Sequence, residues 1–115
     1  MAFSEIELAR IHKTMFLFIE RVRPPAHLRD QLDIAYRVSD QAVEIFEVRP
    51  RWDRPTQKQE LSVARARYFK SRDRWTIYWQ RADLKWHIYE PDAEAKSLGA
   101  FLAVVERDEH GCFFG

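Results

Sequence analysis

Apolar and polar side chains alternate most regularly over residues 75–91, which hold three of the four tryptophans. Because successive side chains of a strand point to opposite faces, this period of two predicts two half-buried strands joined as a hairpin. A two-residue loop at residues 82–83 would place every large aliphatic or indole side chain on one face. The expected pairs are Trp79 with Trp86, Ile77 with Ile88, Tyr78 with His87 and Gln80 with Lys85. A slip of one residue would mix the two faces, so burial favours this register.

The same alternation predicts earlier strands, at residues 32–38, 43–48 and 61–70. A tight turn between the first two would set Arg37 opposite Glu44, a favourable pair of opposite charges. A turn at residues 72–73 would join the third strand to the tryptophan-rich hairpin and set Ala66 opposite Trp79. The small alanine side chain leaves space for the indole, as close packing of a protein interior requires.

Two other stretches have the three-to-four-residue apolar period of a helix. Ser4 and Glu7 form a capping box, and the helix that follows is expected over residues 5–22. Either Asp92 or Ser97 would cap a second helix near the C-terminus. The apolar stripes are Leu8, Ile11, Met15, Phe18 and Val22 in the first helix, and Leu98, Phe101, Leu102 and Val105 in the second.

These elements predict one α+β domain over residues 1–115: an N-terminal helix, an antiparallel meander sheet of about five strands, and a C-terminal helix. Both helices would cover one face of the sheet, which buries their apolar stripes. Phe46 and Val48 would then point to the other face. We expect the apolar tail at residues 112–115 to cover these two side chains.

The length of 115 residues is that of one domain, and a chain of this size buries enough surface for a core without disulfides. Hydrophobic residues make up 46% and charged residues 32%, values that are ordinary for a globular protein. The single Cys112 excludes an internal disulfide and a cysteine-based metal cluster. No signal peptide or membrane-spanning apolar stretch is visible, so we expect a cytoplasmic location.

Charge is distributed unevenly, although the formal net charge is only +1. Residues 49–74 hold nine Lys and Arg against three Asp and Glu, whereas residues 90–110 hold two against six. Such asymmetry can mark a nucleic-acid-binding surface. The alternative is a globular protein whose basic and acidic segments balance, and the near-neutral total favours this alternative.

The predicted strands gather basic and aromatic side chains on the face opposite the helices. This face would carry Arg65, Arg67, Tyr78, Lys85 and His87, with Tyr89 nearby. Pro50 and Pro55 predict a long loop over residues 49–59 rather than a central strand. The cations and indole of this loop are Arg49, Arg51, Trp52 and Arg54. An exposed Trp52 could stack on a base or dock a protein, but we favour an indole folded back beneath the arginines.

These residues suggest a non-enzymatic binding module as the leading functional hypothesis. Cations would hold phosphates and aromatic rings would stack on bases, which favours single-stranded nucleic acid as the partner. A protein partner and a homo-oligomer are the open alternatives. We expect neither a cofactor nor a bound metal, because the four histidines show no ligand spacing and the three glycines form no phosphate-binding loop.

A small nuclease is the alternative function, in one of two forms. Asp33 and Glu47 loosely resemble the Mg²⁺-binding pattern PD-(D/E)XK, but Arg49 stands in place of the lysine. His87 among tyrosines and cations could instead act as the base of a metal-independent ribonuclease. We favour a simpler interpretation of His87, as a histidine on a polar strand face.

Several segments of the sequence resemble a known family. They are RPP at 23–25, RDQLD at 29–33, VEIFEVRPRW at 43–52, WQRADLKWHIYEP at 79–91 and the terminal GCFFG. The family is small and bacterial, and is known as a domain of unknown function, number three-zero-two-four. The resemblance covers nearly the whole chain and implies a bacterial protein complete in itself. It implies no activity, so no functional residue is carried over from it.

Overall fold

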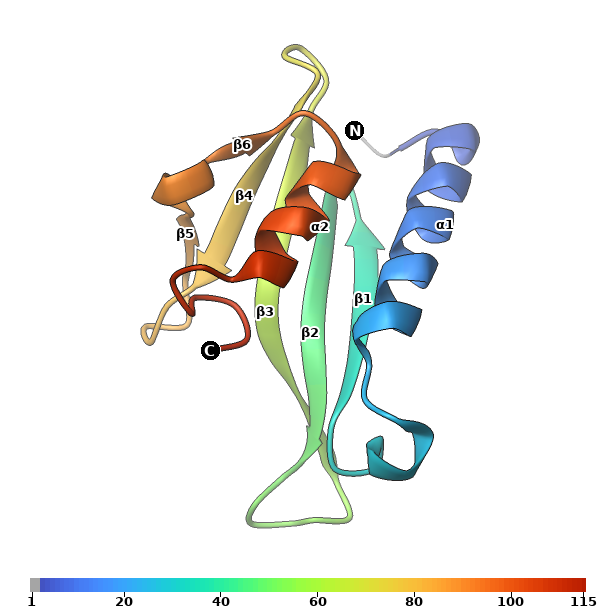
Figure 1. Cartoon of the computed structure of the whole chain (residues 1–115), viewed down its shortest axis with the longest axis vertical. Coiled ribbons are helices and arrows are strands. Elements are labelled where there is room, and N and C mark those ends of the chain that lie inside the picture. The colour runs from blue at the N-terminus through green and yellow to red at the C-terminus, as the bar shows by residue number, and fades with distance from the viewer. Residues whose placement is uncertain (1–2) are drawn as a thin grey trace.

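An antiparallel meander of strands β1 to β5 forms the sheet, and helices α1 and α2 lie against one of its faces (Figure 1). This computed structural model describes residues 3–115. The strands are β1 (Asp33–Ser39), β2 (Ala42–Pro50), β3 (Lys58–Phe69), β4 (Arg74–Gln80), β5 (Trp86–Ile88) and the short β6 (Glu94–Ala95), which pairs with β4. The helices are α1 (Glu5–Val22), α2 (Leu98–Arg107) and the short 3-10 helices η1 (Ala26–Leu28) and η2 (Glu90–Asp92). The predicted α+β fold is confirmed.

Both long helices begin at capping residues that the sequence indicates. Ser4 Oγ accepts a hydrogen bond from Glu7 N at 3.2 Å, and Ser4 N donates to Glu7 Oε1 at 2.8 Å. With this capping box, α1 spans the predicted residues 5–22. Ser97, rather than Asp92, caps α2, because its Oγ accepts from the backbone N–H three residues further on. No helix within residues 3–115 is long and apolar enough to cross a membrane.

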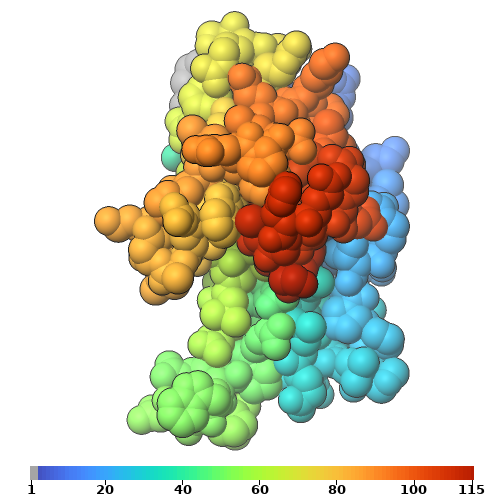
Figure 2. All heavy atoms as spheres, turned by 60° about the vertical axis from the view of Figure 1, so that its left-hand side comes forward, coloured from blue at the N-terminus to red at the C-terminus, as the bar shows by residue number. Residues whose placement is uncertain are grey.

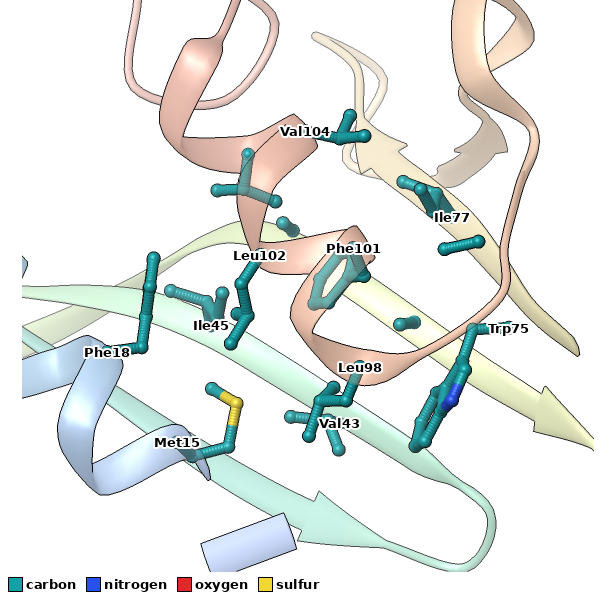
Figure 3. Close-up of a cluster of buried hydrophobic side chains, with 14 of the residues drawn as sticks. Met15, Phe18, Val43, Ile45, Trp75, Ile77, Leu98, Phe101, Leu102 and Val104 are labelled. Carbon is teal, nitrogen blue, oxygen red and sulfur yellow. The ribbon is translucent and has the colours of Figure 1, made fainter. Parts of the chain in front are cut away.

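The core lies between the helices and the inner face of the sheet, which we define as the face that α1 and α2 cover (Figure 3). Met15 and Phe18 of α1 and Phe101 of α2 are at most 1% exposed. They pack with Val43 and Ile45 of β2, which are fully buried. Removing apolar surface from water, at about 25 cal/mol per Å², makes this layer the main source of stability.

The register between β1 and β2 is as predicted, whereas the next two strands extend further than expected. Arg37 faces Glu44, with Nε 2.9 Å from Oε2. Pro50 is the last residue of β2 and pairs with Lys58, the first residue of β3. The loop between them is therefore residues 51–57, and the longer predicted loop is wrong. A proline is tolerated at a strand end, and the two strands continue past the helices as a ribbon (Figure 1).

The register between β3 and β4 differs from the prediction by two residues. Ala64, rather than Ala66, faces Trp79, because the loop between the strands contains residues 70–73 instead of a two-residue turn. A shift of two leaves each side chain on its predicted face, since the strand repeat is two residues. The predicted small-to-large contact between alanine and indole is kept, with a different alanine.

The register between β4 and β5 differs by one residue, and the predicted pairing is wrong. The observed pairs are Tyr78 with Ile88, Trp79 with His87 and Gln80 with Trp86. The loop at residues 82–84 ends with Leu84 in the left-handed region, at a φ of 63°. Such three-residue hairpin loops need a left-handed residue, which is usually glycine or asparagine. A shift of one exchanges the faces of β5.

The C-terminal tail does not cover Phe46, contrary to the prediction. Asp108 ends α2 in the left-handed region, at a φ of 45°, and its carboxylate accepts hydrogen bonds from the N–H groups of the last three residues. This turn folds the tail onto the inner side, where Phe113 packs on Tyr89 with ring centres 4.8 Å apart. Phe46 is covered instead by the guanidinium of Arg37, 4.1 Å from the ring centre.

A partly buried ion pair closes the connection between α1 and β1. Arg23 follows the helix, and its Nη2 and Nε donate to the two oxygens of Asp33 at 2.6 and 3.1 Å. The same carboxylate accepts from Ile34 N at 2.8 Å. Burial of Asp33 favours the neutral acid, but these donors outweigh burial, so the pKa of Asp33 lies below its ordinary value.

Replacing Asp33 by asparagine should make stability less sensitive to acid. Because folding lowers the pKa of Asp33, the ion pair contributes fully above the ordinary aspartate range and is lost as pH falls through the folded pKa. At neutral pH the wild type should have a larger free energy of unfolding than the Asp33→Asn variant. This difference should shrink in acid. Urea titrations from neutral to strongly acidic pH measure this difference, and a constant value would contradict the expectation.

Two tryptophans provide a matched test of the core. Trp75 is 7% exposed and stacks on Phe3, whereas Trp52 is 91% exposed. Trp75→Ala should lower the free energy of unfolding by about 3–5 kcal/mol. Trp52→Ala should change it by no more than about 0.5 kcal/mol. Equal losses in urea titrations of the two variants would show that this packing is wrong.

Candidate functional site

The outer face of the sheet, on the side away from α1 and α2, presents one side chain per strand in each cross-strand row. The central row is Arg37, Glu44, Arg65, Tyr78 and Ile88. Arg65 and Tyr78, both predicted for this face, are therefore direct neighbours on β3 and β4. Arg67 lies in the next row, opposite Thr76.

Carboxylates match much of the positive charge on this outer face. The ion pairs are Arg37 with Glu44 and Glu60, and Arg72 with Glu94. Glu44 also stands directly across from Arg65 in the strand register. The guanidinium of Arg67 lies 5.6 Å from the ring centre of Phe69, so this cation already contacts an aromatic ring. The outer face is a mixed-charge surface, which would repel phosphates at several points.

Three of the predicted site residues do not join the outer face. The one-residue shift in β5 turns His87 to the inner side, and Lys85 lies in the loop before the strand. Tyr89 is 2% exposed beneath the C-terminal tail, and burial raises the pKa of its hydroxyl. Trp86 and Ile88 take the outer positions instead. The sequence carries no signal for this exchange, because a leucine occupies the left-handed loop position.

A cleft of about 570 Å³ opens beside β5, on the side of the molecule that Figure 2 brings forward. Its walls include Trp79, Trp86, Tyr89 and Cys112, and its polar groups are Arg81, His87 and Glu90. The guanidinium of Arg81 lies 5.6 Å from the ring centre of Trp79. Aromatic walls with a few polar groups are typical of ligand sites, so the cleft is one candidate.

The chemistry of this cleft centres on a histidine–aspartate pair. His87 Nε2 lies 2.9 Å from Asp83 Oδ2, and Asp83 Oδ1 accepts from Lys85 N at 2.9 Å. The backbone N–H and then the imidazole lower the pKa of Asp83. Burial raises the pKa of the Cys112 thiol, which favours the protonated, less nucleophilic form. His87 therefore has an orienting carboxylate in Asp83, but no activated nucleophile stands beside it among the described residues that line the cleft.

The second candidate is the tip of the β2–β3 ribbon, which we define as residues 49–58. Trp52 at this tip is 91% exposed, so the predicted indole folded beneath arginines is wrong and the exposed alternative holds. The loop stands clear of the rest of the molecule in Figure 2. A large apolar ring held in water far from the core is a feature of partner-binding loops.

The arginines of the tip differ in how they are held. Arg51 donates from Nε and Nη2 to the two oxygens of Asp53, each at 3.0 Å, and this contact lowers the pKa of Asp53. Arg49 Nε donates to Glu47 Oε1 at 3.0 Å. Arg54 makes no ion pair with any residue in the range 3–115. The tip therefore combines two oriented guanidinium groups with one that is free to meet an anion.

The carboxylates of the nuclease hypothesis are not brought together. Asp33 precedes Ile34, which pairs with Glu47, so the two acidic side chains point to opposite faces of the sheet. Arg23 holds Asp33, and Arg49 holds Glu47. Across the described part of the chain, no three His, Cys, Asp or Glu side chains gather as a metal site would require.

Comparison with known proteins gives a family and no activity. No curated protein and no solved structure matches this chain. A family match extends over residues 3–115 and includes the ribbon tip, the cleft and both long helices. The chain therefore belongs to the family described as Domain of unknown function (DUF3024).

Proposed function

We propose that this protein is a non-catalytic module that binds single-stranded nucleic acid through the tip of the β2–β3 ribbon. The observation that carries this proposal is the 91% exposure of Trp52 on a loop rich in arginine. Stacking of a base on an aromatic side chain stabilises such complexes by about 1–3 kcal/mol per base. Because every base has an aromatic face, the contact is tolerant of sequence.

The charge of the tip supports an anionic partner. Residues 49–58 contain four Lys and Arg and one Asp. Lys58 donates to the backbone carbonyl of Asp30, which fixes its position at the base of the ribbon. Guanidinium groups bind phosphate oxygens in a bidentate way, and Arg54 is available for this contact. An exposed indole can stack on a base while the neighbouring cations bind the phosphate of the same nucleotide.

A single strand suits this tip better than a duplex does. The indole can stack only on a base whose face is open, and bases in a duplex are already stacked on one another. The tip also acts apart from the outer face, because seven residue steps along β3, about 23 Å, separate Lys58 from Arg65. Glu60 lies between them on that face, and Glu44 stands directly across from Arg65.

Trp52→Ala should weaken binding to a mixed-sequence oligonucleotide about 5- to 150-fold, the effect of losing about 1–3 kcal/mol of stacking. Arg54→Ala should reduce the log–log slope of affinity against salt by about 0.7, the value for one phosphate contact on a single strand. Fluorescence anisotropy in low salt measures both quantities. Leu84→Ala is the matched control, since Leu84 is 76% exposed on another loop and should leave affinity unchanged.

The outcome that rejects this proposal is equally specific. Wild-type protein that binds no oligonucleotide at high micromolar concentration would exclude it, and so would equal affinities of the Trp52→Ala and Leu84→Ala variants. If the paired variant Arg65→Ala/Arg67→Ala lost affinity and Trp52→Ala did not, the outer face would be the binding surface instead.

A metal-independent nuclease is the second candidate, because His87, which lines the cleft, is hydrogen-bonded to Asp83 at 2.9 Å. A base oriented by a carboxylate is the arrangement that general-base catalysis uses. We expect no cleavage of labelled RNA, and we expect His87→Ala to retain oligonucleotide affinity, because His87 lies outside the ribbon tip. Cleavage by the wild type that His87→Ala abolishes would favour the nuclease.

A further inference from the structure

Helix α1 exposes a second apolar surface on the side away from the core. Phe16 and Leu17 are 60% and 56% exposed, although both are large and apolar. Lys13 and Glu20, one helical turn before and after them, are exposed as well. We call these four residues the outward face of α1. In the same helix Met15 and its core neighbours point to the sheet, so Phe16 and Leu17 take no part in the core.

The spacing within the outward face is that of a helix-packing surface. Positions 13, 16, 17 and 20 follow one another by three, one and three residues, which places them together on one side of a helix. The order is also symmetric: one apolar pair lies in the middle, with a cation on one side and an anion at the same distance on the other. Such an arrangement is complementary to itself when the second helix runs in the opposite direction.

We propose that this face is the contact between two copies of the chain, with the α1 helices antiparallel across a two-fold axis between Phe16 and Leu17. Phe16 then packs on Leu17 of the second copy, and Lys13 meets Glu20 of the second copy. A two-fold axis makes each contact occur twice, which is the pattern of an isologous dimer. A second copy is the partner because reversing the order of these four residues sets each charge opposite a counter-charge. The same reversal sets each apolar side chain opposite another apolar side chain.

The charged pair favours this arrangement over the parallel one. Parallel helices would set Lys13 against Lys13 and Glu20 against Glu20, which is repulsive in both places. Lys13 makes no ion pair within residues 3–115, and Glu20 lies 3.5 Å from an Arg23 whose shorter contact is with Asp33. Both groups are therefore available to a second copy. This inference is independent of nucleic-acid binding, because the ribbon tip plays no part in it.

Charge exchange tests the proposal directly. Lys13→Glu and Glu20→Lys each create two like-charge contacts, so each should shift the monomer–dimer equilibrium towards monomer by at least about tenfold. The double variant Lys13→Glu/Glu20→Lys restores opposite charges and should recover most of the dimer. Phe16→Ser should also dissociate it, because the centre of the contact loses its apolar packing. Sedimentation velocity over a concentration series measures these constants.

Lys96→Glu is the matched control, since this exposed lysine is not part of the outward face of α1 and its variant should dimerise like the wild type. Circular dichroism confirms that each variant keeps its helices. Wild-type protein that stays monomeric at high micromolar concentration would overturn the proposal. A double variant as dissociated as either single variant would overturn it as well, since the charges would then not face each other.

Discussion

The structure depends on burying the inner face of the β1–β5 meander under helices α1 and α2. Met15, Phe18 and Phe101 meet Val43 and Ile45 in this layer, and each of the five side chains is at most 1% exposed. The helices cover one face of an antiparallel sheet, so the other face must remain compatible with water. Arginine–carboxylate pairs and an arginine over Phe46 meet this requirement on the outer face. The need to solvate that face explains its mixed charge without a partner.

The sequence predicts those parts of the fold that depend on local patterns. The capping box at Ser4, the stripe of α1 and the pairing of Arg37 with Glu44 follow from spacing alone, because neighbouring positions decide them. The β4–β5 register could not be predicted, because Leu84 adopts a left-handed conformation that its residue type does not signal. The docking of the tail depends on Asp108 and residues beyond it, a tertiary contact that no periodicity reveals.

For the candidate site, too, the features that local patterns decide could be predicted, and those that depend on tertiary structure could not. Arg65 and Tyr78 share one face as expected, because an error of two residues preserves strand faces, whereas the error of one in β5 moves His87 to the other side. The exposure of Trp52 could not be read from composition, since an indole beside arginines is compatible with both a packed and a free ring. The length of the ribbon determines that the indole is exposed. The paired strands extend to Pro50 and Lys58, so Trp52 lies too far from the core to pack against it.

The central claim is that the ribbon tip, and not the cleft beside β5, meets the nucleic acid. The chain has four tryptophans, and each gives one indole N–H resonance that can be assigned by single Trp→Phe variants. Titration of the ¹⁵N-labelled protein with a single-stranded oligonucleotide measures which indoles sense the ligand. The account predicts that the Trp52 resonance shifts while those of Trp75, Trp79 and Trp86 stay in place. Shifts confined to Trp79 and Trp86 would contradict it and place the ligand in the cleft.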